Sequence, residues 1–109
     1  MLTLYYILRI EDKNGRGCYS TPLTKKMLGN HIGDDIYHPT PYQDKKISRD
    51  RKHGEVCGFL NWIQLLRWFN IRQLILLAGM GFYIKRVKVI LTAIGETQVL
   101  GKRVERSRL

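Results

Sequence analysis

The stretch NWIQLLRWFNIRQLILLAG, residues 61–79, decides the fold that we predict. Asn61 and Asn70 each precede an apolar run and are followed three residues later by glutamine, a pattern typical of a helix N-terminus with a capping box. Apolar residues then recur at helical spacing, which indicates two successive helices; one helix kinked near Asn70 is the alternative. The predicted core side chains are Trp62, Leu65, Leu66 and Phe69 in the first helix and Ile71, Leu74, Ile75 and Ala78 in the second.

The opposite side of these two helices is also apolar, with Ile63, Trp68, Leu76 and Leu77. A domain of this size does not leave such a stripe fully solvated. Either it forms a second core layer under a long loop, or it contacts a partner or a second copy of the chain in a homodimer. Trp68 is the candidate anchor of such an interface, because tryptophan is enriched among residues that dominate binding energy.

Strands are predicted on both sides of the helices. Residues 2–11 alternate in the manner of a strand, and residues 82–91 and 97–105 form two more around a turn at Ile94-Gly95-Glu96. Phe82 and Ile84 share one face of the second strand, whereas Val87, Val89 and Leu91 share the other. The phase therefore slips at Lys85-Arg86, and we predict a β-bulge there.

The remaining segments read as turns and loop. Asn14-Gly15 lies in a turn over residues 12–17, and residues 20–55 form a long polar loop that contains all three prolines and room for a short helix at 23–28. Residues 106–109 are a basic, frayed tail. We therefore predict a single α+β domain over residues 1–109: a small antiparallel sheet of about three strands, with two short helices packed on one face and a long irregular loop.

The charge balance points to anionic partners. Nineteen Lys and Arg stand against nine Asp and Glu in 109 residues, a formal net charge of +10. The 44% apolar content excludes wholesale disorder. The most apolar stretch, residues 74–84, is about half of the roughly 20 residues that span a bilayer, and the N-terminus lacks the pattern of a signal peptide. We expect a cytoplasmic protein without a membrane contact, in which Cys18 and Cys57 are reduced thiols.

The candidate binding residues are basic and fall into two clusters. The hairpin cluster and the loop cluster could both contact phosphates or acidic protein surfaces, with Tyr5, Tyr6 and Tyr83 as stacking surface for single strands. The alternative is a solvated basic face that keeps the protein soluble. The sequence lacks the spacings of base-specific motifs. The hairpin cluster is Lys85, Arg86, Lys88, Lys102 and Arg103; the loop cluster is Lys45, Lys46, Arg49, Arg51 and Lys52.

No metal, cofactor or catalytic site is predicted. The metal-type side chains lack the paired spacing of closed zinc sites, nothing in the sequence orders a thiol nucleophile, and no glycine-rich loop opens a helix to hold phosphates. Arg9, Ser20-Thr21 and Glu96-Thr97-Gln98 loosely resemble a degenerate ADP-ribosyltransferase site, with Gln98 where a glutamate is needed and Ser20 too soon after Arg9. The metal-type side chains are His31, Asp34, Asp35, His38, Asp44, His53 and Cys57.

Short strings spread along the chain carry a family resemblance. They are Arg9-Ile10-Glu11-Asp12, Gly15-Arg16-Gly17-Cys18-Tyr19, His38-Pro39-Thr40-Pro41 with Asp44, Gly58-Phe59, residues 65–69, Gly81-Phe82 and Thr97-Gln98-Val99. Together they resemble a group of small, mostly uncharacterised proteins of tailed phages and prophages. The basic Lys85-Arg86-Val87-Lys88 and the basic end depart from that pattern. The resemblance implies a phage accessory protein that acts in the host cytoplasm, and it carries over no catalytic residues.

The predicted function is non-enzymatic. We expect a phage-type accessory protein that binds a host protein or nucleoprotein complex through the basic hairpin and loop, as an inhibitor of a host defence system such as an anti-CRISPR would. One alternative is a nucleic-acid-binding module without sequence specificity. The other is an enzyme with the degenerate ADP-ribosyltransferase-like site.

Overall fold

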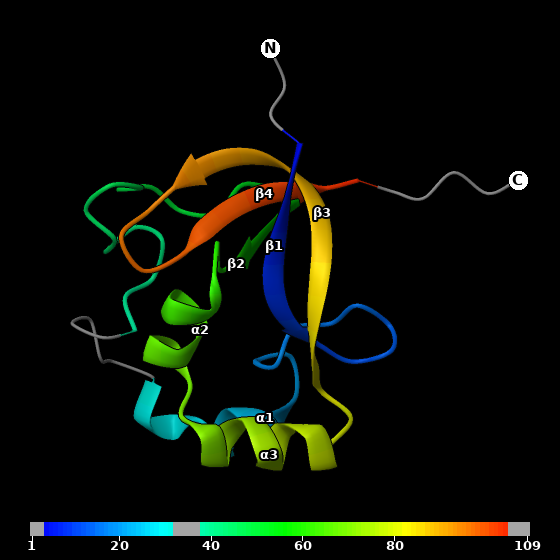
Figure 1. Cartoon of the computed structure of the whole chain (residues 1–109). Helices are drawn as coiled ribbons and strands as arrows, with labels where there is room; N and C mark the ends of the chain where they lie inside the picture. Colours follow the sequence, from blue (N-terminus) through cyan, green and yellow to red (C-terminus); the bar gives the residue numbers. More distant parts are fainter. Residues whose placement is uncertain (1–3, 32–37, 105–109) are drawn as a thin grey trace, which may run out of the picture.

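The computed structural model describes residues 4–31 and 38–104 (Figure 1). An antiparallel sheet and short helices make up this part of the chain, so the predicted α+β class is confirmed. The strands are β1 (Leu4–Glu11), β2 (Glu55–Gly58), β3 (Tyr83–Ile94) and β4 (Val99–Arg103). The helices are α1 (Pro22–Met27), α2 (Trp62–Trp68) and α3 (Ile71–Gly79), with a 3-10 turn at Gly29–His31.

The helix starts are as predicted. The Asn61 side chain accepts a hydrogen bond from the Gln64 N–H at 2.9 Å, and the Asn70 side chain accepts one from the Gln73 N–H at 2.8 Å. Asn70 and Gln73 complete a capping box. At Asn61 the glutamine instead accepts from the Leu60 N–H at 2.9 Å. Two separate caps explain why the chain forms two helices that change direction at Asn70.

The sheet has one strand more than the three that we predicted. Its order is β1-β3-β4-β2, so β2 lies beside β4, with Glu55 opposite Lys102 and Gly58 opposite Val99. β2 begins at the last residue of the predicted loop, residues 20–55, and continues to Gly58, where no strand was predicted. Four residues in a polar context carry no readable alternation, and pairing with a distant strand makes them a strand.

The sheet curls until its two ends meet. Leu8 and Phe59, directly after β2, exchange backbone hydrogen bonds of 2.7 and 2.8 Å, so β2 leads the chain back to β1. This close approach requires a glycine at position 58, because a Cβ there would lie 2.6 Å from the Ile7 side chain and 2.9 Å from the Leu8 carbonyl oxygen. The curled sheet therefore has an inner and an outer face, as a small barrel does.

Two apolar clusters occupy these two faces. The inner cluster is Ile7, Val87, Val89 and Val99. The outer cluster packs the helices against the sheet and contains Leu8, Ile10, Phe59, Leu65, Phe69, Leu77 and Phe82. In Figure 1, α1 and α3 lie below the sheet and α2 lies beside it. Helices therefore cover only part of the outer face.

The predicted bulge at Lys85-Arg86 is absent. β3 pairs with β1 in regular register from Tyr83 to Ile90, and the irregularity lies instead between Leu91 and Ala93, opposite β4. The apolar pattern of β3 changes phase because different parts of the strand pack against different neighbours. Ile84 packs under the helices, whereas Val87 and Val89 point inside the curled sheet.

The predicted helical core face is wrong in part. Leu65 and Phe69 are buried as expected, but Trp62 and Leu66 in α2 and Ile71 and Ile75 in α3 are exposed. In α3 the fully buried residue is Leu77, which we had placed on the opposite stripe. A helix that is apolar nearly all round offers several overlapping stripes, and the tertiary contacts choose between them.

One carboxylate ties the long loop to the β3–β4 turn. Asp44 is buried, and its oxygens accept from the Glu96 N–H at 3.0 Å, the Thr97 N–H at 3.0 Å and the Thr97 hydroxyl at 2.8 Å. Burial by itself would raise the pKa of the Asp44 carboxyl, but these hydrogen bonds outweigh it and hold the pKa below its ordinary value.

Asp44→Asn is expected to lower the free energy of unfolding by about 2–3 kcal/mol, because an amide NH2 would replace an oxygen that accepts from backbone donors. Urea denaturation measures the loss. Asp50→Asn removes the same charge from an exposed position of the same loop and is expected to change little. Equal stability of the two variants would contradict this role of Asp44.

Candidate functional site

The part of the outer sheet face that the helices leave open is basic. Tyr6 lies opposite Lys88, and Lys102 lies opposite Ile90, so these side chains share one face with Arg86. The Arg86 guanidinium lies over the Tyr6 ring, 4.8 Å from its centroid. Tyr6, Arg86, Lys88 and Lys102 are all exposed. We call these four residues the outward basic face.

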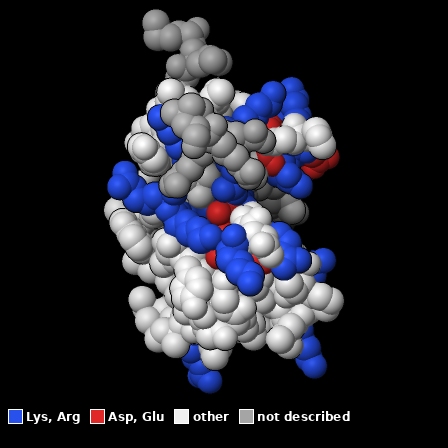
Figure 2. All heavy atoms as spheres, turned by 90° about the vertical axis from the view of Figure 1, so that its right-hand side faces the viewer, with Lys and Arg blue, Asp and Glu red and all other residues white. Residues whose placement is uncertain are grey.

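No ion pair joins Arg86, Lys88 or Lys102 to a carboxylate within residues 4–31 and 38–104. Figure 2 shows Lys and Arg gathered in a band across the side of the molecule where β3 and the turn after β1 lie, with acidic side chains in its middle. Arg86, Lys88 and Lys102 form no ion pair with acidic side chains among the described residues, and such cations suit an anionic ligand, since they gain binding energy only when it arrives.

The two other cations of the predicted hairpin cluster are held by the protein itself. Lys85, which we predicted as a contact residue, is half-buried, and its Nζ donates to the Asp12 carbonyl oxygen at 2.7 Å. Arg103 forms an ion pair with the buried Glu11, which also accepts from Arg9 Nε at 2.7 Å. Burial opposes ionisation of Glu11, but the two arginines outweigh burial and lower its pKa. Lys85 and Arg103 therefore stabilise the end of the sheet.

The predicted loop cluster also contains both cations that bind other parts of the protein and cations with exposed side chains. Arg49 binds the Glu55 carboxylate through two hydrogen bonds of 2.8 and 2.9 Å, and Arg51 donates to the Glu55 carbonyl oxygen at 2.6 Å. These two arginines hold the loop against β2. Lys45, Lys46 and Lys52 have exposed side chains.

The Arg49–Glu55 pair makes stability depend on pH. Glu55 is 1% exposed, and the hydrogen bonds from Arg49 hold the pKa of its carboxyl well below the ordinary value of 4.5. A carboxyl whose pKa is lower in the folded than in the unfolded state stabilises the fold above about pH 4.5, and this contribution is lost as the pH falls toward the folded pKa.

Glu55→Gln is therefore expected to cost about 3 kcal/mol at pH 7, because it leaves Arg49 without its counterion. The difference from the wild type is expected to narrow below about pH 4.5, where the unfolded carboxyl takes up a proton. Denaturant unfolding at several pH values measures it, with the exposed Glu96→Gln as control. A difference that stays constant from pH 7 to pH 3 would contradict the assignment.

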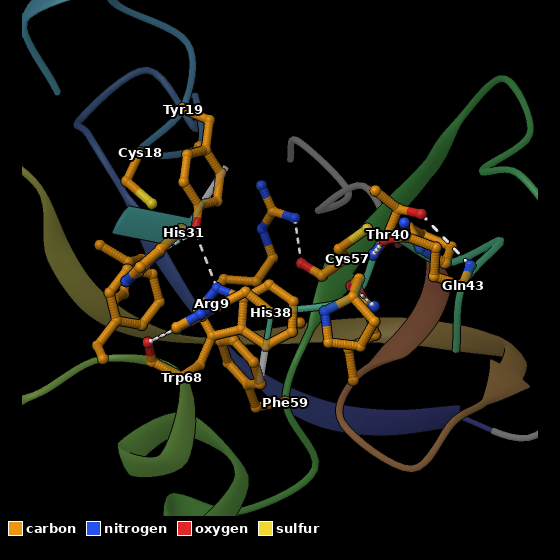
Figure 3. Close-up of a pocket in the computed structure, with 17 residues that line it drawn as sticks. Arg9, Cys18, Tyr19, His31, His38, Thr40, Gln43, Cys57, Phe59 and Trp68 are labelled. Carbon is orange, nitrogen blue, oxygen red and sulfur yellow. Dashed lines mark hydrogen bonds between the residues drawn. The ribbon is translucent and has the colours of Figure 1, made fainter. Parts of the chain in front are cut away.

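Trp68 lies in a pocket that the sequence did not reveal. The pocket has a volume of about 450 Å³ and is lined by side chains from β1, the segment after it, β2, the end of α2 and residues 38–43 (Figure 3). The Trp68 indole N–H donates to the Tyr19 hydroxyl at 2.8 Å, and its ring packs against His38 and Phe59 with centroids 5.1 and 5.6 Å apart. Trp68 is thus half-buried under the loop, whereas its predicted stripe neighbours Ile63 and Leu76 are exposed.

The structure brings together two of the three positions of the ADP-ribosyltransferase-like alternative. Arg9 and Gln98 both line the pocket, and Gln98 donates to the Pro39 carbonyl oxygen at 2.7 Å. Ser20 is exposed, is not among the lining residues, and donates its hydroxyl to the Gly17 carbonyl oxygen at 2.6 Å. The arrangement therefore lacks the serine that this chemistry would place beside the substrate.

The structure also places both thiols and most of the metal-type side chains. Cys18 and Cys57 are both free, and burial raises the pKa of Cys18 to about 12 and also raises that of Cys57, so both thiols are neutral at physiological pH. Within the described ranges, no three His, Cys, Asp or Glu side chains group in a way that could hold a metal ion. Asp44 has the structural role given above, and Asp34 and Asp35 lie outside the described residues.

Comparisons with known proteins identify a phage family. The family described as Bacteriophage T4 Y00F protein matches residues 1–107 of this chain. Neither a curated protein nor a solved structure matches this chain. None of the helices in the described ranges is long and apolar enough to cross a membrane.

Proposed function

The chain belongs to the Bacteriophage T4 Y00F protein family, and we propose that, as a phage accessory protein in the host cytoplasm, it binds a host macromolecule through the outward basic face. The observation that carries the proposal is the set Arg86, Lys88 and Lys102, which share one uncovered face and form no ion pair within the described residues. Such a face speeds encounter with an anionic partner and favours it over neutral competitors.

A host protein or nucleoprotein complex fits the whole surface better than naked nucleic acid does. Besides the basic face, six large apolar side chains of α2 and α3 are 44–67% exposed: Trp62, Ile63, Leu66, Ile71, Ile75 and Leu76. Exposed apolar side chains of this number mark protein contacts, which combine an apolar centre with a charged rim. We call these six residues the apolar helix face.

The mode of action that we propose is occupation of a surface. The two thiols are neutral and Ser20 lies outside the pocket, so none of these three side chains is an activated nucleophile. A protein that covers the working surface of a host defence complex, as an anti-CRISPR does, needs no reaction of its own. Steric exclusion and charge complementarity are sufficient.

Sequence-nonspecific binding of nucleic acid is the second candidate. The observation that favours it is the exposed Tyr6 ring beneath the Arg86 guanidinium, a pair on which an unpaired base can stack while Lys88 and Lys102 contact phosphates. The two candidates differ in their response to salt. Phosphate binding weakens steeply as salt rises, and a contact with an apolar centre weakens much less.

Affinity purification of the tagged protein from infected host cells tests the proposal, with each lysate divided and one half treated with nuclease. A host protein that remains bound after nuclease treatment and at moderate salt is the expected result. Recovery of nucleic acid alone, lost on nuclease treatment, would overturn the proposal in favour of the second candidate. Recovery of nothing but a second copy of the chain would contradict both and assign the apolar helix face to a homodimer.

A further inference from the structure

The pocket beside Trp68 lies apart from the outward basic face, and none of its lining residues belongs to that face. We propose that it binds a purine nucleobase of the guanine type, with the ring against the aromatic side chains that line the pocket and its acceptor edge against Arg9. This inference does not depend on the proposed function.

The walls are aromatic and held in place before any ligand arrives. Figure 3 shows Tyr19, His38, Phe59 and Trp68 around one space, from segments far apart in the sequence. The Tyr19 hydroxyl holds the Trp68 ring in place, because it accepts from the Trp68 indole N–H and is itself bonded to His31 Nδ1 at 2.6 Å. Flat, preformed aromatic walls favour planar ligands, since stacking on them costs little ordering entropy.

Arg9 supplies the polar edge. Its side chain is 11% exposed; Nε binds Glu11, and Nη1 donates to the Cys57 carbonyl oxygen. Nη2 has no hydrogen-bond partner within the described residues, and Arg9 lines the pocket (Figure 3). An arginine held in this way presents donors to a ligand from a fixed position. The ligand must therefore carry acceptors where it meets Arg9.

Arg9 supplies positive charge to the described lining of the pocket. Within the described residues, no carboxylate lines it. Glu11 shares its charge between Arg9 and Arg103, so the three groups together keep a positive charge behind the wall. The neutral Cys18 and Cys57 thiols add apolar surface, not reactivity. A neutral heteroaromatic ring with acceptors suits this environment, because it brings no ionic charge to desolvate.

The size of the pocket and the acceptor pattern narrow the class. A volume of about 450 Å³ lies within the range of small-ligand pockets, roughly 300–1,000 Å³. Guanine presents two neighbouring acceptors, O6 and N7, to the Nη2 donor that Glu11 and Cys57 leave open on Arg9, whereas adenine presents a donor beside N7. We therefore expect guanosine and inosine to bind more tightly than adenosine.

NMR titration of the full chain with these nucleosides tests the inference. Nucleosides lack phosphate and so engage no phosphate-binding function of the basic face. The Trp68 indole N–H resonance is expected to shift saturably with guanosine, while that of the exposed Trp62 outside the pocket stays unchanged. 7-Deazaguanosine, which lacks the N7 acceptor, is expected to bind about 10-fold more weakly. Equal shifts of both tryptophans, or no saturation below about 1 mM, would overturn the inference.

Substitution of Arg9 gives an independent arm. Arg9→Gln is expected to weaken guanosine binding at least about 10-fold and to abolish the preference over adenosine. Arg86→Gln removes the same charge from outside the pocket and is expected to leave binding unchanged. Should Arg9→Gln fail to fold, the comparison of guanosine with 7-deazaguanosine on the wild-type protein still tests whether the acceptor edge of the base is recognised. Unchanged affinity in a folded Arg9→Gln variant would contradict the role of Arg9.

Discussion

Phe69→Ala lowers the free energy of unfolding by about 3–5 kcal/mol, the expected cost of removing a large aromatic side chain from a packed core. Phe69 is 2% exposed and ends α2, and its ring lies edge-to-face against His31 and Phe59. Its removal leaves a cavity between the helices and the curled sheet. Since small domains have only about 5–15 kcal/mol of stability in total, urea denaturation will show a large shift.

Trp62→Ala is the control, because it removes an even larger aromatic side chain from the other end of α2. Trp62 is 55% exposed, and its loss is expected to cost less than about 1 kcal/mol. Sequence periodicity alone assigned both residues to the core, whereas the structure buries only Phe69. Comparison of the two variants therefore tests the observed packing against the prediction from periodicity. A Trp62→Ala variant as unstable as Phe69→Ala would show that the helix is rotated from the position described above.

Reversal of the three unpaired cations, Arg86→Glu, Lys88→Glu and Lys102→Glu together, is expected to weaken binding of the host partner at least about 100-fold. The side chains are exposed and form no ion pair with the described residues, so the fold does not depend on their charge. The thermal midpoint is expected to change little. Binding is measured as the amount of partner captured at fixed salt.

A second triple variant controls for net charge. Lys25→Glu, Lys26→Glu and Arg72→Glu reverse three exposed cations of α1 and α3, and so change the net charge by the same amount away from the outward basic face. This variant is expected to retain the partner. Equal loss of binding in both triple variants would mean that overall charge, not one face, attracts the partner.

Lys85 shows why the sequence could not define the proposed binding face. In the sequence, Lys85, Arg86 and Lys88 form one basic run, but strand alternation turns Lys85 away from Arg86. Lys85 then binds the Asp12 carbonyl oxygen, and Arg103 binds Glu11 across the sheet. Both of these cations have partners more than 70 residues away in the chain, and the local sequence pattern does not predict such partners.

The predicted elements were correct where local chemistry determines structure. The caps at Asn61 and Asn70 and the turn at Gly15, where φ is +80°, follow from neighbours within four residues. β2 and the pocket depend instead on distant contacts. Tyr19, Phe59 and Trp68 meet only because the curled sheet returns to β1, so their spacing in the sequence gave no signal of a common site.

The most direct test of the central claim is lysine footprinting of the captured complex. Acetylation rates are measured by mass spectrometry for each lysine of the free protein and of the protein bound to its host partner. If the partner binds the outward basic face, we expect strong protection of Lys88 and Lys102 in the complex. Lys25 and Lys26 on α1 are expected to be modified as fast in the complex as in the free protein. Unchanged modification of Lys88 and Lys102 in the complex would contradict the account and place the partner elsewhere on the protein.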